Sequence, residues 1–165
     1  MKGESEQLPR GLRNRNPLNI RKSDQLWKGQ IGNDGKFCTF ESNEWGFRAA
    51  FRVLHTYNTK YNISSVRGII NRWAPPSDSN NTSAYINKVC QTMKVEPHYK
   101  FLIKSEDIGW QIDACNMVLA MAQVENGVNR CDINMGEIIE GYFRAFPELR
   151  NKHFSPQVSD FNCPT

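Results

Sequence analysis

A long apolar stretch between Asp107 and Asn129 constrains the fold more than any other part of the sequence, which reads DIGWQIDACNMVLAMAQVENGVN there. Its apolar residues recur at the spacing of one helical face, as Ile112, Cys115, Val118, Leu119 and Ala122 do. This pattern predicts a helix that is amphipathic to nearly fully buried. Gly127 supplies the usual left-handed stop. The rest of the chain is therefore expected to pack around this helix.

Glu125 is the last ionisable residue of that helix and continues its apolar face. Its carboxyl group is expected at the end of a core helix, half in apolar surroundings. Burial of this kind raises the pKa of a glutamate towards the value that a general acid needs. The helix alone leaves two other interpretations open, a frayed glutamate in water or one that is paired with an arginine.

Length and composition predict one soluble globular domain over residues 10–165, preceded by a flexible arm of residues 1–9. The chain has 165 residues, of which 39% are hydrophobic and 23% charged, enough for a substantial core. It contains no apolar run near the roughly 18 residues of a membrane span. The start MKGESEQLPRGLR lacks the apolar core of a signal peptide. Synthesis in the cytoplasm, without Sec export and without a membrane span, is expected.

The cysteines predict neither disulfides nor a metal centre. They are odd in number and form no CxxC or Cys/His spacing, standing at Cys38, Cys90, Cys115, Cys131 and Cys163. We expect reduced thiols, no metal and no cofactor. The net charge of +4 suits an anionic polymer, either nucleic acid or bacterial wall.

The remaining patterns predict an α+β fold, mainly α, with about five helices and one small β-hairpin. The hairpin is LWKGQI and FCTFES around an Asn33-Asp34-Gly35 turn. Besides the 107–126 helix, helices are expected from Ser42 or Asn43 to about Tyr61, from Ser64 or Ser65 to Trp73, from about Thr82 to Met93, and from Asp132 or Asn134 to Phe146. Residues from Pro147 onwards are expected to form a loop.

Basic and amide side chains crowd the segment from Arg10 to Arg21. Four arginines surround three asparagines and Pro17, a composition that predicts an ordered loop with many side-chain to backbone hydrogen bonds. Such a loop can bind phosphate or sugar. It can equally be a solvated basic loop.

Several of these segments together resemble a known family. The runs RGLRNRNPLNIR, WKG, FCTFES, WGFRA and RGIINRWAPPSDSNNTSAYINKV, between Arg10 and Lys94, are similar to the small lysozyme-like proteins of phages and prophages that begin with an NPxNIR motif. AMAQVENG at 120–127 fits the end of the family's later helix. Pieces also resemble soluble lytic transglycosylases and flagellar muramidases, but in a rotated order, as in a circular permutation. The resemblance implies a lysozyme-like domain.

The resemblance also implies a peptidoglycan-cleaving glycosidase, either a muramidase or a lytic transglycosylase. Glu125 corresponds to the proton donor to the bond between N-acetylmuramic acid and N-acetylglucosamine. A hydrolase would use a second carboxylate, for which Glu41, Glu44 and Asp34 are the candidates, whereas a lytic transglycosylase manages with one glutamate. A monomer acting on the glycan strands of the bacterial cell wall is expected. Carriage in a virion and delivery through a holin or a secretion system stay open.

Five further residues are candidates for substrate binding. The resemblance gives Tyr85 as a hydroxyl that orients the acid, with a core aromatic as the alternative. Trp27 and Trp73 could stack on sugar rings or belong to the core. Asn16 and Asn19 could bind hydroxyl or N-acetyl groups, or could hold their own loop.

Two other classes of function remain in play. One is a non-catalytic virion or wall-binding module of the same fold, since catalysis depends on the site and not on the fold. The other is a nucleic-acid-binding domain that uses the arginines between Arg10 and Arg21. Its signals are the weakest, because the charge is modest and no groove-reading motif is present. We therefore expect no nucleic acid among the partners.

Overall fold

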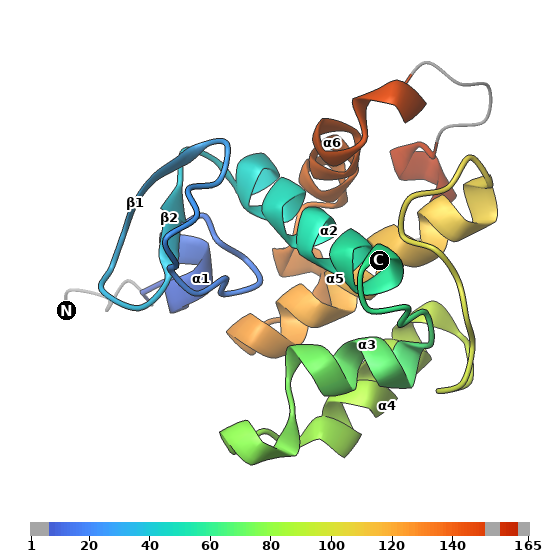
Figure 1. Ribbon diagram of the computed structural model, residues 1–165. Coiled ribbons are helices and arrows are strands. Elements are labelled where there is room, and N and C mark those ends of the chain that lie inside the picture. Colours follow the sequence, from blue (N-terminus) through green and yellow to red (C-terminus); the bar gives the residue numbers. More distant parts are fainter. Residues whose placement is uncertain (1–6, 151–155, 162–165) are drawn as a thin grey trace, which may run out of the picture.

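Helix α5 (Ile108–Asn126) runs through the centre of the molecule, and the other elements pack around it (Figure 1). The computed structural model describes residues 7–150 and 156–161. Asp107 caps the helix by accepting a hydrogen bond from the backbone N–H of Trp110, and Gly127 ends it with a φ of 62°. All residues from Met117 to Gln123 are buried. The predicted core helix is thus confirmed.

The other long helices begin where the sequence predicts. Ser42, Ser65, Asn81 and Asn134 each cap a helix by accepting a hydrogen bond from a backbone N–H of its first turn. The helices are α2 (Asn43–Thr59), α3 (Val66–Trp73), α4 (Thr82–Met93) and α6 (Met135–Ala145). The fold is α+β and mainly α, as predicted. No helix in the described part of the chain is long and apolar enough to cross a lipid bilayer.

Helices α2 and α6 have the most extensive contact of any two helices in the described part of the chain (Figure 1). They approach at Gly141, where a Cβ would lie 2.6 Å from the Cβ of Phe47, so no larger residue fits. Tyr142 packs edge-on against Phe51 and Phe146, and its hydroxyl donates to the backbone carbonyl of Ile103. Helix α4 packs on α5 from the other side. Together these contacts make one continuous hydrophobic core.

The small β-hairpin packs at one end of this helical core. Strands β1 (Gln30–Asn33) and β2 (Cys38–Phe40) are antiparallel, with a bulge between Gln30 and Gly32. Asp34 holds the turn by accepting hydrogen bonds from the backbone N–H groups of Lys36 and Phe37. It also accepts one from Arg10 at 2.6 Å, and this partner is the main reason why the pKa of Asp34 is lowered.

The structure corrects three details of the sequence interpretation. Residues Arg10–Arg13 form a short helix, α1, and not a loop. The first strand begins at Gln30 and not at Leu26, because the backbone turns between Trp27 and Gln30. Beyond Ala145 the chain forms 3₁₀ turns at Pro147–Leu149 and Val158–Asp160. Most of the predicted arm, residues 1–6, lies outside the described residues, as does Cys163. We call residues 10–40, from α1 to β2, the hairpin lobe.

Candidate active site

Side chains from three separate segments converge on the carboxylate of Glu125, in the last turn of α5. Trp73 donates its indole N–H to Oε1 over 3.1 Å, and the hydroxyl of Tyr85 donates to the same oxygen over 3.1 Å. The amide of Asn19 donates to Oε2 over 3.2 Å. These donors lie 52, 40 and 106 residues away in sequence. The half-buried glutamate is thus the meeting point of the hairpin lobe, α3 and α4.

Local structure explains why each donor reaches Glu125. Trp73 is the last residue of α3, and Pro75 and Pro76, two and three residues later, prevent the helix from continuing. Tyr85 lies in the first part of α4 and is 5% exposed, so only its hydroxyl needs a polar partner. Asn19 has a φ of 52°, a left-handed conformation that asparagine tolerates better than most residues.

The hairpin lobe is tied to the end of α5 by the residue after the glutamate. Asn126 donates from its buried amide to the backbone carbonyl of Pro17 over 2.7 Å. Asn19 also donates to the backbone carbonyl of Glu125 over 3.3 Å. Gly11 packs against these two asparagines, leaving no room for a Cβ. The loop that carries Asn19 is therefore fixed on the helix end.

The two oxygens of Glu125 have different surroundings. Oε1 accepts two hydrogen bonds, and one comes from an indole N–H, which can only donate. Among the described residues, Oε2 accepts only from Asn19, whose amide it shares with the backbone carbonyl of Glu125. Burial first, and then the charge of Glu125, raises the pKa of Tyr85 well above its ordinary value, so Tyr85 stays a donor. When Glu125 is protonated, the proton is therefore best placed on Oε2.

Glu125 lies where two surface cavities adjoin. The main cavity, of about 400 Å³, lies between the hairpin lobe and the helices, and Asn19, Arg21 and Phe37 face Trp73 and Glu125 across it. The side cavity, of about 320 Å³, is lined by Tyr85, Val124 and Glu125 among others. Both share Glu125 and Asn80. The carboxylate thus stands between two hollows, a shape that suits a chain-like substrate with units on both sides of it.

The predicted binding residues divide into two groups. Asn19, Trp73 and Tyr85 contact Glu125. Trp73, which was predicted to stack on a sugar or to belong to the core, donates its indole N–H to the Glu125 carboxylate. Asn16 is fully buried, and its amide bonds to the backbone of Ile20 and Cys38, so it holds its loop and presents nothing to a ligand.

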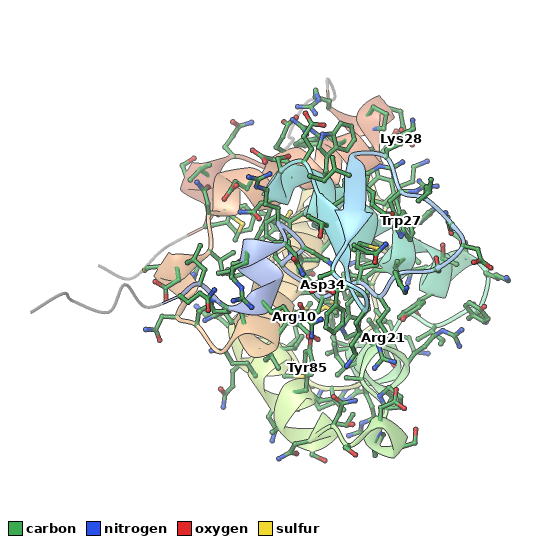
Figure 2. All side chains as sticks on the ribbon, turned by 90° about the vertical axis from the view of Figure 1, so that its left-hand side faces the viewer. Arg10, Arg21, Trp27, Lys28, Asp34 and Tyr85 are labelled. Carbon is green, nitrogen blue, oxygen red and sulfur yellow. The ribbon has the colours of Figure 1, made fainter. Side chains whose placement is uncertain are left out.

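Trp27 lies apart from the cavities. It is partly buried against the core and lines neither cavity. Figure 2 shows it, with Lys28, towards the opposite end of the hairpin from Arg21 and Tyr85. The expected sugar-stacking role is not supported by this position.

The structure does not bring the candidate second carboxylates to Glu125. Glu41 is exposed just after β2, and Glu44 lies in the first turn of α2 beside α6, where burial first, and then the charge of Glu44, raises the pKa of Glu137. Asp34 is bound in its turn. Among the described residues, Asp78 is the only other acidic side chain that lines the main cavity. Sequence interpretation missed it, because SDSNNT reads only as a loop.

Metal-binding side chains do not gather anywhere in residues 7–150 and 156–161: no three of His, Cys, Asp or Glu form a potential metal site there. Cys38, Cys90 and Cys115 are buried thiols.

Comparison with known proteins gives a relative from a bacteriophage. No family model matches the chain. Over 125 residues it is 36% identical to Protein P5 of Pseudoalteromonas phage PM2, an alignment that covers 73% of the chain and 72% of that protein. The chain belongs to the family of this phage protein. The name Protein P5 states no activity.

Proposed function

We propose that the protein is a peptidoglycan-cleaving glycosidase of the lysozyme-like class, with Glu125 as its general acid. The observation that carries the proposal is the half-buried carboxylate, which lies between two adjoining cavities and is held by Trp73, Tyr85 and Asn19. Membership of a bacteriophage protein family supports the substrate, because a phage has to open the wall of its host.

In the proposed reaction the glycan strand occupies both cavities, and the bond to be cut lies beside Glu125. Oε2 delivers its proton to the oxygen between N-acetylmuramic acid and N-acetylglucosamine, while positive charge develops on the sugar ring that keeps C1. The carboxylate left behind keeps the bonds from Trp73 and Tyr85 on Oε1. These donors are in place before the reaction, so no reorganisation is needed as the charge forms.

The fate of the developing positive charge separates a muramidase from a lytic transglycosylase. Asp78 is the carboxylate best placed to stabilise that charge or to orient a water, because it lines the main cavity with Glu125. A lytic transglycosylase would instead close the ring with the sugar's own hydroxyl. Mass spectrometry of the products distinguishes the two, since hydrolysis leaves a reducing end and transglycosylation leaves anhydro-muramic acid.

The proposal is tested by Glu125→Gln. Glutamine keeps the volume and an acceptor for Trp73 and Tyr85 but has no proton to give. We expect the rate of lysis of purified walls, followed by turbidity, to fall by about 10²–10⁴. Wall binding and the melting temperature should change little, because only the contact with the Asn19 amide is lost.

Glu41→Gln and Glu44→Gln are matched controls, since both remove one carboxylate outside the cavities. Each should lyse walls at close to the wild-type rate. Full activity of Glu125→Gln, or cleavage of amide bonds only, would contradict the proposal. If the wild type bound walls without cutting them, the chain would instead be a wall-binding module.

A further inference from the structure

Two arginines line the main cavity that contains Glu125. Arg72 precedes Trp73 at the end of α3, and Arg21 comes from the hairpin lobe on the opposite wall. In the part of the chain that the structure describes, the four ion pairs found involve neither of them. Both guanidinium groups are therefore available to a ligand.

Arg72 is held in place by aromatic rings. Its guanidinium carbon lies 3.5 Å from the ring centroid of Tyr61 and 5.2 Å from that of Tyr57, which also lines the main cavity. Cation–π contacts of this kind orient the planar group without neutralising its charge. A guanidinium that is ordered before binding loses less side-chain entropy when a ligand arrives.

Arg21 is placed by the hairpin. Its backbone forms an isolated antiparallel bridge with Phe37, which also lines the cavity. Figure 2 shows Arg21 on the side of the hairpin that faces the helix of Tyr85. The hairpin lobe has seven lysines and arginines against two aspartates, a net charge of +5 in a chain whose total is +4. The lobe that supplies this wall of the cavity is thus basic, and Arg21 is its arginine in the lining.

The acidic groups of the cavity do not cancel this charge when the enzyme is ready to react. Asp78 and Glu125 are the carboxylates in the lining. A glutamate that is about to donate its proton is neutral, which leaves one aspartate against two arginines. The cavity then has a net positive charge and attracts an anion.

We propose that Arg72 and Arg21 form a subsite for a carboxylate carried by the wall strand, next to the bond that Glu125 cleaves. The inference rests on the proposed function and deepens it. Guanidinium groups match the two oxygens of a carboxylate. Muramic acid residues carry carboxylates, either on the lactyl group or on the attached peptide, whereas chitin oligomers carry none. The subsite would thus distinguish peptidoglycan from chitin.

The test measures binding in the Glu125→Gln background, where no strand is cut. The ligands are peptide-bearing glycan strands, denuded strands with free lactyl carboxylates, and chitohexaose. We expect Arg72→Gln to weaken binding of at least one carboxylate-bearing strand by about tenfold, as loss of a charge-assisted hydrogen bond does, and to leave chitohexaose unchanged. Loss with the denuded strands identifies the lactyl group, and loss with the peptide-bearing strands alone identifies the peptide.

Arg67→Gln is the matched control, because Arg67 is an exposed arginine of the same helix that lines neither cavity at Glu125. The subsite would be overturned if both variants weakened binding equally, or if Arg72→Gln weakened binding of all three ligands equally. It would also be overturned if the Glu125→Gln parent did not prefer carboxylate-bearing strands. Wall lysis by the wild type tests the glycosidase separately. If strands bind through Arg72 but are never cut, the subsite is supported and the proposed glycosidase activity is contradicted.

Discussion

Replacing Gly11 by alanine tests whether the hairpin lobe and the acid are coupled as the structure indicates. A Cβ at this position would lie 2.5 Å from Oδ1 of Asn126 and 2.9 Å from both Oδ1 of Asn19 and the backbone oxygen of Asn16. Overpacking of this kind costs about 1–3 kcal/mol. The gain in helix propensity, up to about 1 kcal/mol, opposes it. The clash should prevail, because the backbone oxygen cannot rotate away.

The expected result for Gly11→Ala is a net loss of about 1–2 kcal/mol, which lowers the melting temperature by roughly 2–8 °C in a chain of this size. Lysis should slow as well, because Asn19 is pushed away from Glu125. Gly32→Ala is the control, since a Cβ there meets nothing within 4 Å, and it should change the free energy of unfolding by less than about 0.5 kcal/mol. Thermal unfolding and wall turbidity measure both effects. If Gly11→Ala melts and lyses like Gly32→Ala, the packing argument is refuted.

Two more changes test the surroundings of Glu125 and the partly buried carboxylate of Glu137. Tyr85→Phe removes one of the two donors to Oε1 and should lower the lysis rate about tenfold while wall binding persists; an unchanged rate would show that the hydroxyl does not assist the acid. Burial raises the pKa of Glu137 above its ordinary 4.5, so its ionisation destabilises the fold as pH rises through the folded-state value. The melting temperature of Glu137→Gln should therefore exceed that of the wild type at pH 7, and the two should be equal at a pH far below 4.5. A difference in melting temperature that grows on acidification would contradict this prediction.

The helices were predictable because their signals are local. Ser42 and Asn134 were among the cap candidates next to apolar periodic segments, and α2 and α6 begin directly after them. Helix α1 was missed because four residues without an apolar period carry no such signal. The first strand was placed too early, since its apolar residues continue through the turn before Gln30.

The site was only partly predictable, because much of it depends on tertiary packing. Glu125 was singled out from the apolar periodicity of its helix, and the resemblance gave its role and that of Tyr85. The structure joins the two side chains by a hydrogen bond. Asp78 lies in a segment that reads as a loop, and the apolar pattern of the helix that ends at Trp73 gives no role to Arg72. They come together only in the tertiary structure, where the end of α3 and the loop after it line the same cavity as the hairpin lobe. Glu44, in contrast, was a candidate for the site, but its helix places it beside α6 and away from Glu125.

The hydrogen bond from Asn126 to the backbone carbonyl of Pro17 makes the site depend on docking of the hairpin lobe against α5. A two-stranded hairpin is at best marginally stable alone, so the hairpin lobe depends on docking against α5. Local opening of this lobe would remove Asn19 from Glu125 while the helical core stays intact. Amide hydrogens of β1 and β2 should then exchange faster than those of α5. On warming, the proposed wall-cleaving activity should then be lost before the helices melt.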